Sequence, residues 1–107
     1  MEIDMLEQIF KKQEDLQKEL NAVYNQEYIN TMTLAAIDEL LEMLRETPWK
    51  PWKKNQHFNH DEYKKELADV LHFIVNLCLV ENISAKDLYE EYMEKNKINF
   101  ERKKENY

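Results

Sequence analysis

The chain has 107 residues, a length typical of one domain, and it contains no glycine and only two prolines. A sheet protein without glycine would lack the residue on which tight hairpins depend, whereas helices lose nothing. We therefore expect a single all-α domain spanning residues 1–107. The net charge of −7 argues against a general nucleic-acid binder and suits a protein that binds divalent cations.

The expected compartment is the cytoplasm. Cys78 is the only cysteine, so no disulfide can form within the chain, which favours a reducing environment. The first residues lack the basic and apolar regions of a secretory signal. The most apolar stretch, residues 67–80, is too short to span a bilayer and is interrupted by polar side chains. We expect neither a membrane nor a nucleic acid as a partner.

Four helices follow in chain order from the 3.6-residue period and its boundary signals. The first covers roughly residues 4–23 and the second residues 30–46, before a stiff loop with two prolines and two tryptophans at 48–52. Asn59 and Ser84 have the pattern of N-caps and open helices that run to about residue 81 and toward the C-terminus. The third helix is apolar over more than half of its circumference. These features predict a four-helix bundle-like fold whose core is completed by a second subunit.

Two pairs of acidic residues have the spacing of metal ligands. Glu39 and Glu42 lie three residues apart on the second helix, as do Glu66 and Asp69 on the third, so each pair shares a helix face. Clusters of carboxylate oxygens suit Mg²⁺, which takes a few carboxylates together with substrate phosphates and water. The same spacing also fits an ordinary solvated acidic face, and the spacing alone leaves both interpretations open.

Other polar and aromatic residues are also candidates for a binding site. Lys95, Asn99 and Arg102 follow one stripe of the last helix and can bind phosphate oxygens, although they also suit a basic helix C-terminus. The remaining candidates have ordinary structural explanations as well: a lone histidine beside an apolar surface, two loop tryptophans, and two amides one turn apart on the first helix. They are His72, Trp49, Trp52, Gln17 and Asn21.

Several mechanisms are excluded by composition. Without glycine the chain has no Walker-type phosphate loop and no dinucleotide-binding fingerprint. One cysteine and three histidines do not give the spacing of a zinc site. Ser84 is the only serine and has the pattern of a helix cap, so no serine nucleophile is expected.

Together these segments resemble the all-α nucleotide pyrophosphatase superfamily of MazG and the dimeric dUTPases. The chain is most similar to the dimeric dUTPases. The similarity runs from residue 16 to residue 107 and includes both acidic pairs, in five segments. These are Leu16-Gln17-x-x-Leu20-Asn21, Glu39-x-x-Glu42, Pro48-Trp49-Lys50-x-Trp52-Lys53, Glu66-Leu67-x-Asp69-x-x-His72-Phe73, and Lys95-x-x-x-Asn99-x-x-Arg102 with a final Tyr107.

The resemblance implies a reaction and a role for each segment. Glu39, Glu42, Glu66 and Asp69 would bind two or more Mg²⁺ ions, for which Mn²⁺ can substitute. A metal-held water, oriented by Glu39 or Glu42, would attack the α-phosphorus of dUTP and release dUMP and pyrophosphate. The resemblance further implies that the outer phosphates are bound by Lys95, Asn99, Arg102 and Tyr107, and that the base and sugar pocket is formed by Gln17, Asn21, Trp49 or Trp52, and His72.

Two rival functions are kept beside this one. The first is a MazG-like house-cleaning pyrophosphatase for another triphosphate, such as dCTP or dATP. The chain is shorter than usual for dimeric dUTPases, and Asn106 replaces the glycine that commonly precedes the final tyrosine, so uracil specificity is less secure than pyrophosphatase chemistry. The second is a non-catalytic helical interaction module. We expect a homodimer as the minimal unit, with a tetramer of two dimers as the larger alternative.

Overall fold

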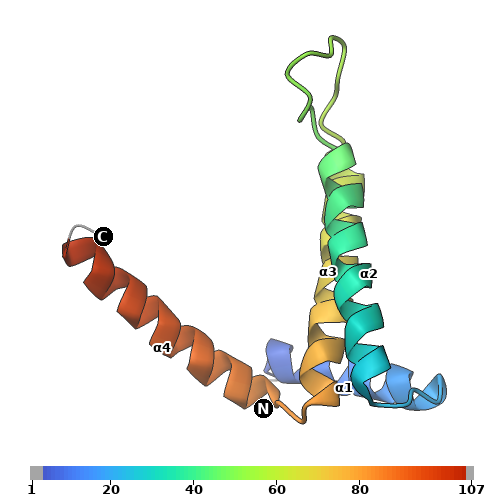
Figure 1. Cartoon of the computed structure of the whole chain (residues 1–107), viewed down its shortest axis with the longest axis vertical. Helices are drawn as coiled ribbons and strands as arrows, with labels where there is room; N and C mark the ends of the chain where they lie inside the picture. The colour runs from blue at the N-terminus through green and yellow to red at the C-terminus, as the bar shows by residue number, and fades with distance from the viewer. Residues whose placement is uncertain (1–3, 106–107) are drawn as a thin grey trace.

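The computed structural model describes residues 4–105, which form four helices and no strand. Figure 1 shows the helices in order: α1 (Met5–Glu19), α2 (Gln26–Arg45), α3 (His60–Val80) and α4 (Ala85–Lys104). The all-α class expected from the sequence is confirmed. Two boundaries differ from the expected ones, because α1 ends four residues earlier and α2 begins four residues earlier.

Polar caps explain where each helix begins. The Asp4 carboxylate accepts from the backbone N–H groups of Leu6 and Glu7 at the start of α1. The Asn25 and Asn59 side chains do the same for α2 and α3. Ser84 and Asp87 form a reciprocal capping box at the start of α4. Each cap satisfies backbone donors that have no partner inside the helix.

Asparagine takes the place of glycine where α1 and α3 end. Asn21 and Asn82 both have a φ of 56°, the left-handed conformation that closes a helix. Behind them, the Ala22 N–H donates to the Gln17 carbonyl and the Ile83 N–H to the Cys78 carbonyl, the long hydrogen bond of a Schellman motif. Asparagine tolerates this conformation better than other residues with a Cβ, which explains how a chain without glycine terminates two helices sharply.

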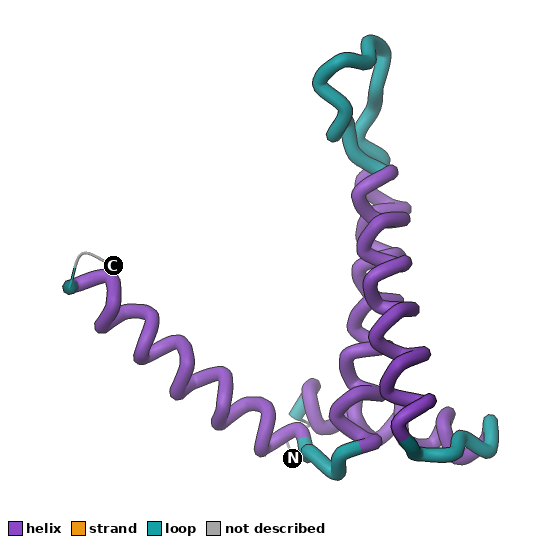
Figure 2. Tube along the Cα trace, in the orientation of Figure 1, coloured by secondary structure: helices purple, strands orange, loops and turns teal. Residues whose placement is uncertain are grey.

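The most extensive packing contact in the fold is between α2 and α3. These two helices form an antiparallel hairpin with the loop of residues 46–59 at its tip, as Figure 2 shows. At the opposite end of the hairpin, α1 crosses α3. Beyond α3 the chain turns by 106°, and α4 leads away from the hairpin (Figure 1).

The buried core is small and lies where α1, α3 and α4 meet. Phe10, Val75, Cys78 and Ala85 form its centre, and Leu6, Leu79 and Leu88 pack around them. Beside it, the buried Gln13 side-chain amide donates to Oδ1 of the Asn76 side chain at 2.7 Å. The Tyr28 hydroxyl donates to the buried Gln17 side chain at 2.8 Å, which ties α1 to the start of α2.

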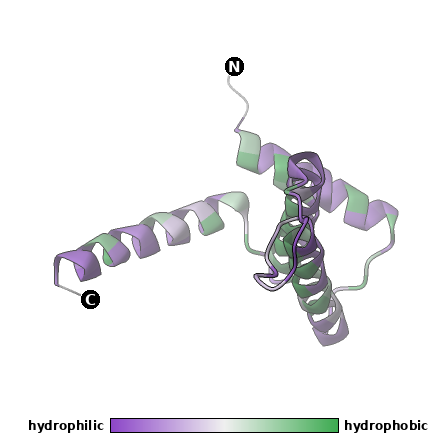
Figure 3. Cartoon of the chain, turned by 90° about the horizontal axis from the view of Figure 1, so that it is seen from above, coloured by the Kyte–Doolittle hydropathy of each residue, from purple (hydrophilic) through white to green (hydrophobic). Residues whose placement is uncertain are grey.

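Much of the apolar surface is exposed in one chain. On α2 the exposed residues include Leu34, Ile37 and Leu41, and on α3 they include Leu67 and Leu71. Figure 3 shows hydrophobic colour along the hairpin and in patches on α4. Exposed patches of this extent mark interaction surfaces in soluble proteins. Within residues 4–105, no single helix is long and apolar enough to cross a membrane, and only α3 and α4 taken together, bent as they are, meet that criterion.

Candidate metal centre

Three of the four expected acidic ligands meet between α2 and α3. Glu39 and Glu42 lie one turn apart on α2, and Glu66 faces them from α3. One carboxylate oxygen of each lies within 4.8 Å of the other two, and all three residues are half-buried. The antiparallel hairpin therefore brings the two acidic pairs of the sequence to the same level.

Glu39 is the most perturbed member of this cluster. Its pKa is raised to about 7, first because the Glu66 carboxyl group is close enough to share a proton with it, and then because of burial. The negative charges of Glu42, Glu66 and Asp69 raise it further. When Glu39 and Glu66 are both ionised neither can donate, and the buried Glu39 Oε2 has no hydrogen-bond partner among the described residues.

This arrangement fits a hard divalent cation. Buried polar atoms are nearly always hydrogen-bonded, so an orphaned carboxylate oxygen beside two further acids requires an explanation. A cation would satisfy Glu39 Oε2 and remove the repulsion among the three charges. An all-oxygen donor set of carboxylates is the kind that Mg²⁺ prefers.

Asp69 and His72 lie further along α3 from Glu66. Both are exposed, and Asp69 lies outside the group of three acids although its charge acts on Glu39. The Nδ1 of His72 lies 2.8 Å from the Ala68 carbonyl oxygen. Because a carbonyl can only accept, Nδ1 carries the hydrogen, and Nε2 of the neutral ring is left as an acceptor.

The loop between α2 and α3 carries both tryptophans. Trp49 and Trp52 pack edge to face with ring centroids 5.8 Å apart, and the Lys50 ammonium lies 5.6 Å from the centre of the Trp49 ring. Gln56 holds the loop closed, because its side-chain amide donates to the carbonyls of Lys50 and Lys53. A polar cavity of about 330 Å³ opens here, lined in part by Arg45, Trp49, Lys50, Lys53 and His57.

The expectation that Gln17 and Asn21 share a helix face is wrong. Helix α1 ends at Glu19, and Asn21 lies beyond it in the left-handed conformation that terminates the helix. Gln17 is buried and accepts the Tyr28 hydroxyl hydrogen bond, so its side chain already has a structural partner. The end of α1 and the connection to α2, which carry these amides, lie at the end of the hairpin opposite the loop between α2 and α3 (Figure 1). Within one chain these two amides therefore lie apart from the tryptophan loop.

Comparison with known protein families identifies the chain. A model of the dUTPase family matches residues 5–81, which is more than half of the chain. The chain belongs to the all-α dUTPase family, and the resemblance seen in the sequence is confirmed. Comparison with curated proteins and with solved structures finds no match.

The match to the dUTPase family covers α1, α2 and α3 and includes all four expected metal ligands. It ends at residue 81, before α4 begins. Lys95, Asn99 and Arg102 therefore lie outside it, on the helix that leads away from the hairpin. Tyr107, the last expected phosphate ligand, lies outside the described residues. The structure thus brings Glu39, Glu42 and Glu66 together. It does not place Lys95, Asn99 and Arg102 of the same chain beside them.

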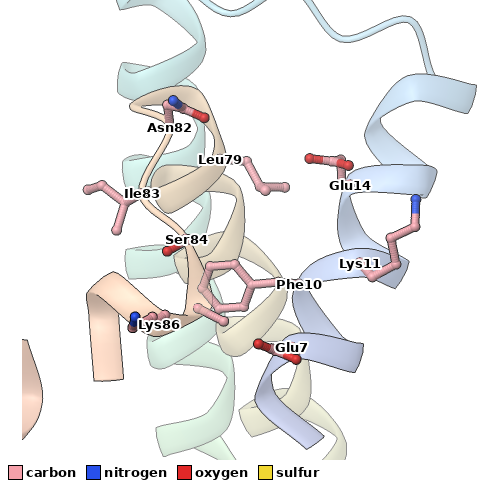
Figure 4. A pocket seen from close by; sticks show the side chains of 10 residues that line it. Glu7, Phe10, Lys11, Glu14, Leu79, Asn82, Ile83, Ser84 and Lys86 are labelled. Atoms are coloured by element: carbon pink, nitrogen blue, oxygen red, sulfur yellow. The ribbon is translucent and has the colours of Figure 1, made fainter. Parts of the chain in front are cut away.

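A separate cavity of about 260 Å³ lies at the junction of α1, α3 and α4 (Figure 4). Phe10 and Leu79 contribute apolar side chains to its lining, and Glu7, Lys11 and Lys86 contribute charged ones. These residues lie at the joint that sets the direction of α4.

Two buried amides, Gln13 and Asn76, are not among the residues predicted from the sequence, and their hydrogen bond joins α1 to α3 of this dUTPase-family fold. Both lie at positions of the helix period that apolar residues usually occupy. A polar residue at such a position was the available signal, because a buried amide needs a partner on a neighbouring element.

Proposed function

We propose that this chain catalyses the Mg²⁺-dependent hydrolysis of dUTP to dUMP and pyrophosphate. One observation carries the proposal: in a chain of the dUTPase family, three half-buried carboxylates from two helices lie within 4.8 Å of one another. The buried oxygen of Glu39, which has no partner among the described residues when Glu39 and Glu66 are ionised, supports a cation at this place. A solvated acidic face would not enclose such an atom.

Glu39, Glu42 and Glu66 would hold the metal, with Asp69 reaching in from the next turn of α3. Two or more Mg²⁺ ions, when bound, supply an activated water and neutralise charge on the triphosphate. Glu39 or Glu42 takes the proton of the attacking water at a carboxylate oxygen.

Substrate binding is assigned to the remaining candidates. Lys95, Asn99, Arg102 and Tyr107 bind the outer phosphates through charge-assisted hydrogen bonds. His72 and Trp49 or Trp52 contact the sugar and base. Gln17 acts by holding Tyr28, whose hydroxyl donates to its side chain.

We further propose that the chain is a single cytoplasmic domain that works as a homodimer. The small core and the exposed leucines and isoleucines of α2 and α3 support association, because a single chain leaves these side chains in water. Cys78, free and buried, is compatible with a reducing compartment.

The test is an assay of pyrophosphate release from a panel of dUTP, dCTP, dATP, dTTP and UTP with Mg²⁺. We expect dUTP to be the best substrate and the Glu66→Gln variant to lose activity by orders of magnitude. Asp38→Asn, which removes an exposed acid next to Glu39, is the matched control and should retain activity. Equal turnover of dCTP or dATP would rule out uracil selectivity. No pyrophosphate from any member of the panel would rule out the enzyme.

A further inference from the structure

We propose that the cavity in the loop of residues 46–59 is an anion site, which binds a phosphate or pyrophosphate group without a metal ion. The cavity has a volume of about 330 Å³ and belongs to the loop at the tip of the α2–α3 hairpin (Figure 2). The inference does not rest on the proposed hydrolysis, because it concerns basic residues to which that reaction gives no role.

The side chains that line this cavity are cations and neutral groups. Arg45, Lys50 and Lys53 contribute positive charges, and His57 contributes an imidazole. Among the described residues no aspartate or glutamate lines the cavity, although acidic side chains outnumber basic ones in the chain by 22 to 15. The sign of the charge is therefore reversed at this place relative to the whole molecule. A hollow lined by charges of one sign concentrates ions of the opposite sign.

The cations of the cavity have no carboxylate to neutralise them. The ion pairs of the described residues lie within α1, α3 and α4, and none includes Arg45, Lys50 or Lys53. Lys50 is half-buried, and its ammonium lies 5.6 Å from the centre of the Trp49 ring. An aromatic face attracts an ammonium more weakly than an anionic oxygen does. A phosphate oxygen that enters the cavity therefore meets donors for which no carboxylate competes.

Gln56 holds both lysines in place. Its side-chain nitrogen donates to the Lys50 carbonyl at 2.6 Å and to the Lys53 carbonyl at 2.8 Å, and its Oε1 accepts from the Lys50 N–H at 3.2 Å. The Lys53 N–H in turn donates to the Lys50 carbonyl at 3.2 Å. Because the loop backbone is already fixed at both lysines, less conformational entropy is lost when an anion binds.

The carbonyl groups at the base of the loop are also occupied. The last carbonyls of a helix carry partial negative charge, which disfavours an anion nearby. At the end of α2 the Leu44 carbonyl accepts from the N–H and the hydroxyl of Thr47, and the Glu46 carbonyl accepts from the Asn59 N–H. The Arg45 guanidinium in the same turn offsets the remaining negative charge.

The chemistry of the lining selects a small phosphate-bearing anion. A volume of about 330 Å³ is at the lower end of the range for small-molecule sites and is enough for pyrophosphate. Arginine presents a planar fork of donors and lysine a point charge, and both bind phosphate oxygens. Arg45 lies one helical turn beyond Glu42, a rise of about 4.5 Å. The phosphate group is therefore either a free anion or the end of a polyphosphate whose cations lie on the acids.

The experiment titrates the whole chain with inorganic pyrophosphate in the presence of a chelator, followed by calorimetry and by tryptophan emission. Both tryptophans of the chain lie in this loop, so a change in emission locates the ligand there. We expect binding with a change in emission, and a dissociation constant about tenfold higher for Arg45→Gln and for Lys53→Gln. Lys54→Gln is the matched control, because Lys54 is exposed in the same loop but does not line the cavity, and it should bind as wild type does.

Three results would overturn the proposal. They are no binding of pyrophosphate to wild type, wild-type affinity in Lys53→Gln, and an equal loss of affinity in Lys53→Gln and Lys54→Gln, which would reduce the effect to net charge. Gln56→Ala keeps every charge and should weaken binding several-fold, because the loop is no longer held. Wild-type affinity in Gln56→Ala would also count against a preformed cavity. Circular dichroism verifies that each variant is folded.

A second titration identifies the source of the phosphate group. Pyrophosphate is added to protein saturated with Mg²⁺ and a non-hydrolysable dUTP analogue. If pyrophosphate still binds, the cavity takes a free anion; if the analogue excludes it, the nucleotide's own phosphates fill the cavity. Either result is consistent with the anion site. Because the first titration contains neither metal nor nucleotide, its failure would leave the proposed hydrolysis untouched.

Discussion

Neutralising Glu39 should stabilise the metal-free protein, although the same change should abolish catalysis. The pKa of Glu39 is about 7 in the folded chain and 4.5 for the ordinary residue, so the fold holds a proton that the unfolded chain releases between these values. Stability therefore falls as the pH rises from about 4.5 to about 7, and the full cost is present above pH 7. At 1.36 kcal/mol per pKa unit the cost has an upper limit of about 3 kcal/mol. Because the side chain is partly solvated, we expect about 1–2 kcal/mol.

The assay is thermal unfolding of wild type and Glu39→Gln at equal protein concentration, with chelator, at pH 8 and pH 5. At pH 8 the variant should melt about 5–10 °C higher, and at pH 5 the advantage should shrink to about a quarter. Asp38→Asn, an exposed neighbour, should show no such pH-dependent gain. Saturating Mg²⁺ should stabilise wild type and leave Glu39→Gln much less affected. A variant less stable than wild type at pH 8 would refute this electrostatic reasoning.

Other predictions concern the same site and its scaffold. Mg²⁺ should bind about tenfold more tightly at pH 8 than at pH 6 by calorimetry, because Glu39 must lose its proton; equal affinities would contradict this. Asn76→Ala should lower the free energy of unfolding in urea by about 1–3 kcal/mol, because Gln13 loses its buried acceptor; an unchanged midpoint would show that the amide pair contributes nothing. Asn82→Gly should keep wild-type stability while Asn82→Val loses about 1–2 kcal/mol, and equal melting of the two would argue against the left-handed cap.

Helix content and the acidic cluster could be predicted from local sequence. The lack of glycine, the caps at Asn59 and Ser84, and the i, i+3 spacing of the acids are short-range signals. Once α2 and α3 form an antiparallel hairpin, Glu39 and Glu66 must meet near the same level. Asp69 was expected as an equal member of the set, but it lies one turn farther and remains exposed.

The helix ends were harder to place, because asparagine gives a weaker signal than glycine. The helical period predicts Asn21 inside the first helix, whereas Asn21 closes that helix. The prediction that Gln17 and Asn21 share one helix face is wrong for this reason. The start of α2 at Gln26 was not predicted for the same reason, because the cap of this helix is also an asparagine, Asn25.

The direction of α4 could not be predicted from its own sequence. It depends on how Ala85 and Leu88 dock against Phe10 and Val75, which are contacts between residues far apart in the chain. Helical periodicity showed that Lys95, Asn99 and Arg102 share a stripe, but it contains no information on which surface that stripe faces.

The central claim is tested most directly by the position of hydrolysis in dUTP. Turnover in ¹⁸O-labelled water with Mg²⁺, followed by mass spectrometry of the products, identifies the phosphorus atom that water attacks. Attack at the α-phosphorus, as proposed, gives dUMP with one ¹⁸O atom and unlabelled pyrophosphate, and Glu66→Gln should give neither product. Label in pyrophosphate or inorganic phosphate, or the formation of dUDP, would contradict the proposed reaction.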